Sequence, residues 1–573
     1  MRVRLDGVDR GEEAVEFSFE TAAVTGYPGE TVAAAMIAAG EWRFRSTRGG
    51  EDRGPFCGMG VCGDCLVEID GVLKRACLEP VRDGASIRRA QPRARAPHAA
   101  ESATPEHRTL TPDLLIIGAG PAGLMAAKTA AEAGLQVLVV DERAKAGGQY
   151  FKQPGSGFGV DEAQLDKQFR EGRALFRETE AAGVTFLFDG TVWGIFGPGD
   201  VAVATPEASY RIAAKKLILA PGAYERSAPF PGWTTPGVIT TGAAQTLLRS
   251  AQVSPGRRVL VAGNGPLNIQ LARELSRARV DVVAVVETAA APGLGDIGQV
   301  AAMAAAAPGL MREGLGHVAA LRLAGVPMIY RSAVVRAEGE GRVERAAIAP
   351  IDADGRQAGP ETWHEVDALC LGYGFLPQSE LARSLGCAHD YDPVRKALTV
   401  RREDNGATSV DGVYVVGDGG GLGGARVALS QGFLAGADAA AALDAPLDDK
   451  AVAAARRVLN RHLRFQAALW TLYAAPVITD QLAEDDTLIC RCEEVSHRRL
   501  AESIEEGNSG PGAFKQATRA GMGRCQGRYC AGVIAEMRNR GAAPIGLDDR
   551  QHFAPRAPFK PVPIRQIAKS DDH

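Results

Sequence analysis

Two groups of cysteines, one near each end of the chain, carry the residue types and spacings that point most directly to chemistry. They are Cys57, Cys62, Cys65 and Cys77, and then Cys490, Cys492, Cys525 and Cys530. In a chain of 573 residues, thiols clustered this tightly are typical of metal ligands rather than of disulfides. We therefore expect two metal-containing sites.

The N-terminal group has the spacing C-x4-C-x2-C, with the fourth cysteine twelve residues further on. This is the spacing of plant-type [2Fe–2S] clusters. Gly58, Gly60 and Gly63 suit a loop whose amides wrap around sulfide ions. Zinc is the alternative, but zinc sites usually repeat C-x2-C pairs, so iron–sulfur is favoured.

The C-terminal group reads C-x-C, a gap of 32 residues, then C-x4-C. This pattern resembles that of [2Fe–2S] domains of the bacterioferritin-associated ferredoxin type, which implies a second [2Fe–2S] site. Zinc, with His497 as a spare ligand, is again the alternative. The two remaining cysteines, Cys370 and Cys387, stand alone and are expected to be buried, inert thiols.

The elements that must position this chemistry begin with residues 114–123, L-L-I-I-G-A-G-P-A-G. An apolar strand, a glycine turn and a helical pattern are the context that a dinucleotide fingerprint requires. The candidate binding residues of this turn are Gly118, Gly120, Pro121, Ala122 and Gly123. Phosphates would lie at the N-terminus of the helix, where free N–H groups favour anions.

Further residues extend this candidate site. A second apolar run ends at Asp141 and Glu142, where an acid is expected to accept a ribose hydroxyl. Glycine turns that could approach a flavin are found at Gly148-Gln149, at Gly222 and at Gly417-Asp418. Gly148-Gln149 could instead be an ordinary turn, and Asp418 could be a helix N-cap rather than a ligand of the flavin polyol.

A second fingerprint follows strand-like residues 258–262, with Gly263, Gly265 and a later acid, Glu287. Asn268 replaces the third glycine and is expected to disturb the packing of helix on strand. We therefore do not expect a working hydride-donor site. The fold could hold NAD, ATP or nothing, and Glu287 would favour NAD by bonding the ribose 2′-OH.

Composition excludes several classes of protein. The net charge of −4 suggests no nucleic-acid partner. The sequence contains no run of 18 uncharged apolar residues, so no membrane span is predicted. The first residues contain no signal-peptide core. With clustered thiols, these features predict a cytoplasmic protein.

The motifs together resemble those of flavoproteins with two dinucleotide-binding domains. The chain is more closely similar to the family of amino-acid and opine dehydrogenases, which includes electron-transfer subunits of hydrogen cyanide synthase and D-hydroxyproline dehydrogenase and relatives in the sarcosine oxidase alpha subunit. The segments that carry this resemblance are 53–62, 147–150, 229–233, 408–418, 423–428, 490–494 and 518–530.

The resemblance implies an α/β, Rossmann-like flavoprotein whose second domain is inserted in the first. A β-grasp [2Fe–2S] ferredoxin-like domain would precede it, and a small α-helical [2Fe–2S] domain of the bacterioferritin-associated ferredoxin type would follow. The expected boundaries are 1–92 for the ferredoxin-like domain, 93–111 for a linker, 112–240 and 360–445 for the FAD-binding domain, 241–359 for the inserted domain, 446–484 for a helical connector, 485–540 for the second [2Fe–2S] domain and 541–573 for an extended, Pro-rich tail.

The implied cofactors are FAD and two [2Fe–2S] clusters, which makes the chain an electron-transfer subunit of an amino-acid or imino-acid dehydrogenase. No catalytic residues for amine oxidation are identified. In the resembled family, a separate D-amino-acid-oxidase-like FAD subunit oxidises the amine, and an acceptor protein or quinone takes the electrons. The resemblance leaves open a further flavin at the interface with that partner.

Three other functions remain open on the sequence: an NADH-fed flavin and [2Fe–2S] reductase for an oxygenase, a self-sufficient amine dehydrogenase, and a non-catalytic scaffold. Plant-type clusters lie near roughly −400 mV, which is low for accepting electrons from an amine. Either hydrogen bonds and the nearby Arg53 and Arg75 raise the potential of the N-terminal cluster, or this cluster is not the acceptor.

Overall fold

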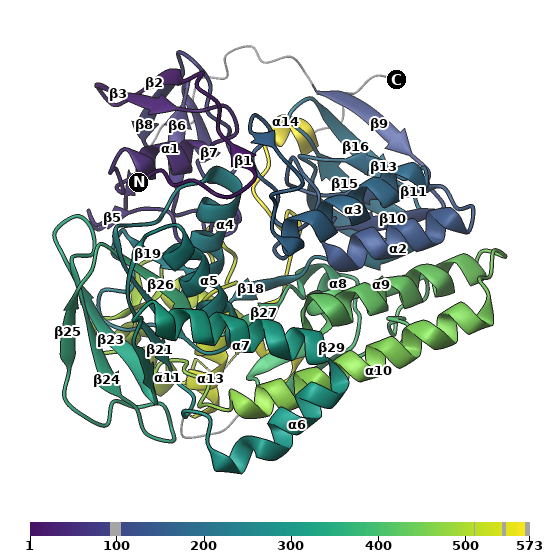
Figure 1. Cartoon of the computed structure of the whole chain (residues 1–573). Coiled ribbons are helices and arrows are strands. Elements are labelled where there is room, and N and C mark those ends of the chain that lie inside the picture. Colours follow the sequence, from purple (N-terminus) through teal and green to yellow (C-terminus); the bar gives the residue numbers. More distant parts are fainter. Residues whose placement is uncertain (92–104, 509, 541–545, 568–573) are drawn as a thin grey trace.

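The computed structural model describes residues 1–91, 105–508, 510–540 and 546–567. Parts of the predicted linker (93–104) and tail (541–545 and 568–573) lie outside these residues. Figure 1 shows four parts: a small N-terminal sheet, two larger α/β units and a helical C-terminal part between and below them. No described helix is both long and apolar enough to cross a membrane.

The N-terminal domain is a five-stranded mixed sheet with one helix, as predicted. Its strand order is β3 (Ala22–Gly26), β2 (Val15–Phe19), β8 (Ser86–Arg89), β6 (Leu66–Ile69) and β7 (Val72–Arg75). Helix α1 (Val32–Ala38) is capped by Thr31, whose side chain accepts a hydrogen bond from the Ala34 amide. The short strands β1 (Val8–Asp9), β4 (Arg45–Ser46) and β5 (Asp52–Arg53) complete the domain.

The first dinucleotide unit is built on a parallel sheet whose inner strands are mostly buried, apolar runs. Its order is β13 (Thr185–Leu187), β11 (Val137–Val140), β10 (Leu114–Ile117), β17 (Lys216–Leu219) and β30 (Val413–Val415). Helices α2 (Pro121–Glu132), α3 (Lys167–Ala181) and α9 (Gly424–Ala441) accompany it, and η2 (Gly417–Gly420) precedes α9.

A second sheet in this unit has the order β14 (Thr191–Gly197), β15 (Asp200–Ala204), β16 (Ala208–Ile212) and β9 (Glu106–Leu110). Strand β9 lies inside the predicted linker, so the linker prediction is wrong for residues 106–110. The physical reason is that β9 pairs in parallel with β16, about a hundred residues away, and local composition does not reveal such a partner.

The inserted unit is a second parallel sheet of order β19 (Val238–Thr240), β26 (Ala368–Gly372), β20 (Arg258–Gly263), β21 (Asp281–Glu287) and β22 (Met328–Tyr330). Its helices are α4 (Thr241–Ala251), α5 (Pro266–Arg277), η1 (Leu294–Asp296), α6 (Ile297–Ala306) and α7 (Pro308–Leu323), and its antiparallel strands are β23 (Ser332–Glu338), β24 (Arg345–Pro350) and β25 (Thr362–Glu365). The predicted boundaries of 241 and 359 are therefore too narrow, because β19 and β26 pair with each other, and β26 with β20.

The connector forms the long helix α10 (Asp449–Leu472), which packs along α9 and α6 (Figure 1). The C-terminal domain contains β31 (Leu488–Cys490), β32 (Val495–Ser496), α11 (His497–Glu505), α12 (Pro511–Thr518) and α13 (Ala531–Asn539). The tail is mostly irregular, with η3 (Asp549–Gln551) and α14 (Ile564–Ile567). The remaining short elements are β12 (Gly159–Val160), β18 (Ala223–Glu225), β27 (Phe375–Pro377), α8 (Glu380–Ser384), β28 (His389–Asp392) and β29 (Ala397–Val400).

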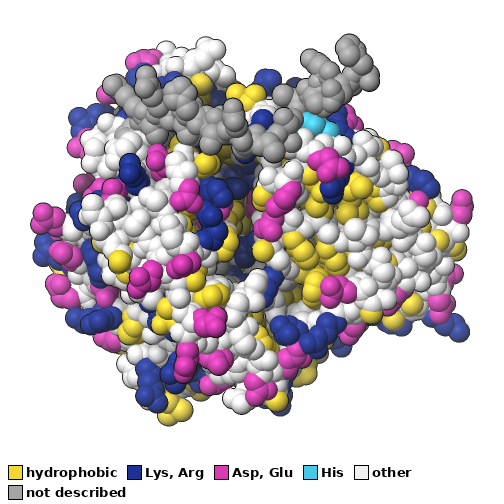
Figure 2. Space-filling view, turned by 90° about the horizontal axis from the view of Figure 1, so that it is seen from above, with side chains coloured by type: hydrophobic (Ala, Val, Ile, Leu, Met, Phe, Trp, Pro, Cys, Tyr) yellow, Lys and Arg dark blue, Asp and Glu magenta, His cyan; other side chains and the backbone are white. Residues whose placement is uncertain are grey.

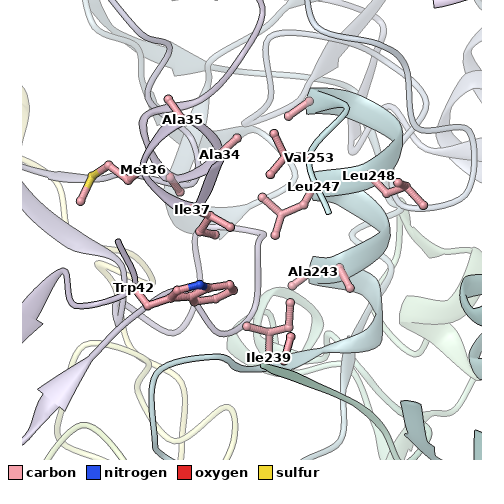
Figure 3. Close-up of a cluster of buried hydrophobic side chains, with 14 of the residues drawn as sticks. Ala34, Ala35, Met36, Ile37, Trp42, Ile239, Ala243, Leu247, Leu248 and Val253 are labelled. Atoms are coloured by element: carbon pink, nitrogen blue, oxygen red, sulfur yellow. The ribbon is translucent and has the colours of Figure 1, made fainter. Parts of the chain in front are cut away.

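The N-terminal domain shares a hydrophobic core with the inserted unit. Ile37 of α1 and the adjacent Trp42 face Ile239, Ala243 and Leu247 at the start of the inserted sheet (Figure 3). All of these side chains are buried. The two parts are therefore packed as one body, which holds the N-terminal cysteines against the dinucleotide units.

Candidate functional site

The N-terminal cysteines lie on the loop between β5 and β6 and just after β7. The Cys62 amide donates to Cys57 Sγ at 3.4 Å, and the free thiols of Cys65 and Cys77 share a hydrogen bond. Burial opposes ionisation of Cys57, but hydrogen bonds from Cys62 and from nearby backbone amides lower the pKa of its thiol to about 6. The loop therefore favours a thiolate, the form that binds metal, at Cys57, whereas hydrogen bonding to Cys57 and to Cys65 raises the pKa of Cys62 and of Cys77.

The C-terminal cysteines lie on two turns. Cys490 ends β31 and shares a hydrogen bond with Cys530 at the start of α13, while Cys492 shares one with Cys525. The hydrogen bond from Cys530 outweighs burial and lowers the pKa of Cys490 to about 7.

The thiols in both groups associate in pairs rather than around one point. In the described part of the chain, no three His, Cys, Asp or Glu side chains converge as ligands of one metal ion would. A [2Fe–2S] cluster takes two thiolates on each of its two irons, so the pairing suits it better than a tetrahedral zinc ion. His497, the spare zinc ligand, lies 3.4 Å from Asp480 through Nε2 instead.

The first fingerprint forms the expected turn at the N-terminus of α2. A Cβ on Gly123 would lie 1.8 Å from the Gly118 carbonyl oxygen, so only glycine allows the helix to pack this closely. Around Gly120 the nearest atom to such a Cβ is the Gly148 Cα, at 3.8 Å. That open face, at the start of a helix with Pro121 in its first turn, fits a pyrophosphate.

The two neighbouring acids at this site have different roles. Asp141 accepts hydrogen bonds from the Ala119 amide at 2.7 Å and the Arg143 amide at 2.9 Å, so one of its oxygens holds the glycine turn and the other holds the segment that follows β11. Glu142 instead pairs with Lys560 of the tail. Burial opposes ionisation of Glu142, but the Lys560 ammonium holds its pKa below the usual value. Lys560 is a site residue that sequence reasoning missed, because no local pattern links it to position 142.

The other predicted flavin residues lie around the same sheet edge. Asp418 Oδ1 accepts from the amides of Gly423 and Gly424, both at 2.9 Å, so this oxygen binds the first amides of α9, whose N-cap residue is Gly423. The Gly417 amide donates to Gln431 Oε1 at 3.0 Å. A Cβ on Gly222 would have no neighbour within 4 Å. A hollow with Lys and Arg side chains lies between the two halves of the molecule (Figure 2), which suits an anionic ligand.

Two buried titratable groups lie between this unit and α4. Lys152 donates to the Gln149 carbonyl at 2.7 Å and to Gln245 Oε1 at 2.9 Å. Burial lowers the pKa of Lys152 to about 7. Glu225 accepts from the Gly242 amide at 2.8 Å, and burial raises its pKa to about 7. Neither residue was predicted, since both are distant in sequence from the fingerprint glycines.

The second fingerprint is well packed, so the expectation that Asn268 disturbs it is wrong. Asn268 is buried, accepts from Thr241 Oγ1 at 2.9 Å and donates to the Gly372 carbonyl at 3.0 Å. The side-chain amide of Asn268 is therefore hydrogen-bonded although it is buried, and it joins α5 to α4 and to β26.

Glu287, the proposed ribose acceptor of this fold, is engaged by the protein itself. Its carboxylate accepts from the Gly265 amide, from Asn264 Nδ2 and from the Ala289 amide, each at 2.9 Å. Asn264 also donates to the Tyr473 carbonyl at 3.0 Å, just beyond α10. The end of α10 therefore lies at this fingerprint.

Comparison with known families matches three segments of the chain. Residues 112–432 match the model described as pyridine nucleotide-disulphide oxidoreductase. Residues 12–92 match a 2Fe-2S iron-sulfur cluster binding domain, and residues 488–537 match a BFD-like [2Fe-2S] binding domain.

Several curated proteins match most of the chain. An opine oxidase subunit of Rhizobium meliloti is 32% identical over 80% of this chain and 98% of its own length. Hydrogen cyanide synthase subunit HcnB of Pseudomonas aeruginosa is 32% identical over 78% of this chain and 97% of its own. The crystal structure of an L-proline dehydrogenase from P. horikoshii is similar in fold, with a TM-score of 0.68 and 22% identity over 98% of this chain and 99% of its own.

Proposed function

The chain belongs to the pyridine nucleotide-disulphide oxidoreductase family, together with the opine oxidase and hydrogen cyanide synthase subunits, and we propose that it transfers electrons from the oxidation of an amino acid or imino acid. It is an FAD-dependent oxidoreductase with two [2Fe–2S] domains. When bound, FAD supplies two-electron chemistry and each cluster supplies one-electron chemistry.

The residues of the chain divide this work. Gly118 and Gly123 allow the tight turn and the close packing of α2, Gly120 leaves room for the pyrophosphate of FAD, and the N-terminus of α2 favours its negative charge. Glu142 provides an ionised carboxylate beside the site. The paired thiols of the two cysteine groups hold the iron atoms.

The observation that carries the proposal is the proximity of the two cysteine groups. Cys492 Sγ lies 3.9 Å from the Cys62 carbonyl oxygen, although 430 residues separate them. Two one-electron sites this close form a relay. The lone cysteines do not support a dithiol reductase, because Cys370 and Cys387 are both buried and burial raises the pKa of each thiol.

The relatives are named as subunits, which supports a hetero-oligomer for this chain as well. The finer proposal is that the partner is a D-amino-acid-oxidase-like FAD subunit that oxidises the amine. Electrons then pass through this chain to an acceptor protein or a quinone. The cytoplasmic location stays a prediction.

The test is reconstitution under anaerobic conditions. The isolated chain is mixed with amino acids or opines, with and without a D-amino-acid-oxidase-like FAD subunit. We expect reduction of flavin and clusters only when both proteins are present. Turnover by the isolated chain would instead make it a self-sufficient dehydrogenase, and redox-silent clusters would make it a scaffold.

A further inference from the structure

The loops that carry the two cysteine groups are joined by a buried ion pair. Asp64, which lies between Cys62 and Cys65, accepts from Arg491 Nε at 2.8 Å. Arg491 itself lies between Cys490 and Cys492. The side chains of Asp64 and Arg491 are 1% and 4% exposed, so water does not screen this pair.

Aromatic rings fix the position of Arg491. Its guanidinium lies 4.0 Å from the ring centroid of Phe56 and 4.5 Å from that of Trp233, and Nη1 donates to the Trp233 carbonyl at 2.9 Å. Stacked and bonded in this way, the guanidinium cannot swing away from Asp64. The ion pair is thus a fixed part of the interface between the cysteine loops.

Two more arginines surround Asp64. Arg45 donates to its Oδ1 at 2.6 Å, and Arg53 is buried nearby with its Nε and Nη2 bonded to no described residue. Arg53 pairs with Glu51 at 2.9 Å, but the Glu51 side chain is 58% exposed. Positive charge therefore exceeds negative charge in the buried space between the two cysteine groups.

We propose that Asp64 and Arg491, together with Arg45 and Arg53, form a shared charge bridge that sets the reduction potentials of both [2Fe–2S] clusters jointly. The proposal rests on the proposed function, because it assumes that both cysteine groups hold clusters. An oxidised [2Fe–2S] cluster with four thiolates carries about two negative charges, and reduction adds about one more. Excess positive charge beside both clusters stabilises their reduced forms.

The bridge also explains how the N-terminal cluster can accept electrons from an amine. Plant-type clusters near roughly −400 mV are poor acceptors, and charge around the cluster is one of the factors that change this value. In each transfer between the clusters, one iron of the donor changes from Fe²⁺ to Fe³⁺ and one iron of the acceptor changes from Fe³⁺ to Fe²⁺. No proton moves and no covalent bond forms or breaks.

The test is a redox titration of the purified chain with dithionite, monitored by electron paramagnetic resonance. Replacing Asp64 by Asn removes the negative charge at constant shape, so both clusters should become easier to reduce. Replacing Arg491 by Gln should make both harder to reduce. We expect at least a tenfold change in each reduction equilibrium, about 59 mV for one electron.

Arg75→Gln is the matched control. Arg75 donates to the Gly60 carbonyl at 2.8 Å within the N-terminal loop, so its loss should move the N-terminal potential alone. If Asp64→Asn and Arg491→Gln also move only one potential, or neither, the shared bridge is refuted. Arg45→Gln, at the more exposed side of the bridge, repeats the test if either of those variants fails to fold.

A measurement on the unmodified chain needs no variant. When both clusters are reduced, their electron spins should interact and broaden both resonance signals relative to the half-reduced protein. Unbroadened signals in the fully reduced protein would contradict the proximity on which the bridge depends. Absence of iron–sulfur signals altogether would instead refute the proposed function.

Discussion

The ring of Trp470 lies beside Gly265, the second glycine of the second fingerprint. A Cβ built on Gly265 would be 3.8 Å from Cζ3 of Trp470. In a working dinucleotide site, this glycine lets the backbone approach the pyrophosphate. Helix α10 therefore brings an indole ring to the place where a second nucleotide would bind.

The first prediction concerns NADH. Because Trp470 covers Gly265 and Glu287 is already hydrogen-bonded, saturating NADH should reduce the flavin far more slowly than roughly 10 per second, the ordinary turnover range. Anaerobic stopped-flow absorbance measures the rate. Trp470→Ala should increase NADH binding, whereas Trp363→Ala, on the distant strand β25, should not. Rapid bleaching of the unmodified protein would make the NADH-fed reductase the better account.

The second prediction concerns metal content. The two cysteine groups should hold about four irons and four acid-labile sulfides per chain, measured on anaerobically purified protein. Cys77→Ser should remove about half of the iron, and Cys370→Ser, at a buried lone thiol, should remove none. Zinc in either site would contradict the iron–sulfur assignment for that group.

The third prediction concerns FAD. Gly120 has φ −78°, a value that any residue can adopt, and the space beside it is open. Gly120→Leu should therefore leave the fold and both clusters intact while its side chain blocks the pyrophosphate and abolishes FAD binding. Flavin absorbance and iron content report on the two effects separately. Gly298→Leu, on the exposed helix α6, is the control and should retain FAD; a stoichiometric flavin in Gly120→Leu would show that this turn is not the FAD site.

The fourth prediction separates the two acids at the first fingerprint. Asp141→Asn weakens the hydrogen bonds that hold the turn, so the free energy of unfolding should fall by about 1–3 kcal/mol. Glu142→Gln leaves the hydrogen bonds of Asp141 to the turn intact, so it should not lower stability in this way. It should instead weaken FAD binding about tenfold. Denaturation curves and flavin titrations measure the two quantities. If Asp141→Asn weakened FAD binding and Glu142→Gln lowered stability, Asp141 would be the residue that binds the ribose.

The fifth prediction concerns pH. The pKa of Lys152 is about 7 when folded and near 10.4 in an unfolded chain, so between these values only the unfolded chain keeps the proton. Stability should therefore rise with pH across this window, by about 2 kcal/mol between pH 7 and pH 9. Lys152→Met should lack this rise. Glu225 has a folded pKa raised to about 7, so its opposing loss of stability lies mainly below pH 7 and ends just above it; the comparison with Lys152→Met, which keeps Glu225, removes this contribution. Equal pH dependence of the melting temperature in both proteins would refute the prediction.

Local patterns were enough to predict the two [2Fe–2S] domains and the dinucleotide-binding unit. The spacings of Cys57 to Cys65 and of Gly118 to Gly123 span few residues, so the backbone of one turn positions the whole motif. The matched domain models confirm the two [2Fe–2S] domains and the dinucleotide unit. The division of labour between Asp141 and Glu142 was not accessible in this way, because it depends on Lys560, more than four hundred residues away.

Only the folded chain decides how these sites meet. Asp64 and Arg491 are 427 residues apart, and Trp470 reaches Gly265 from a helix that follows the whole inserted unit. Likewise, β19 and β26 belong to the inserted sheet because they pair across more than a hundred residues. Spacing along the chain specifies which ligands a turn can present. Contacts between distant segments form only when the complete chain is packed, because several hydrophobic cores together fix the relative positions of those segments.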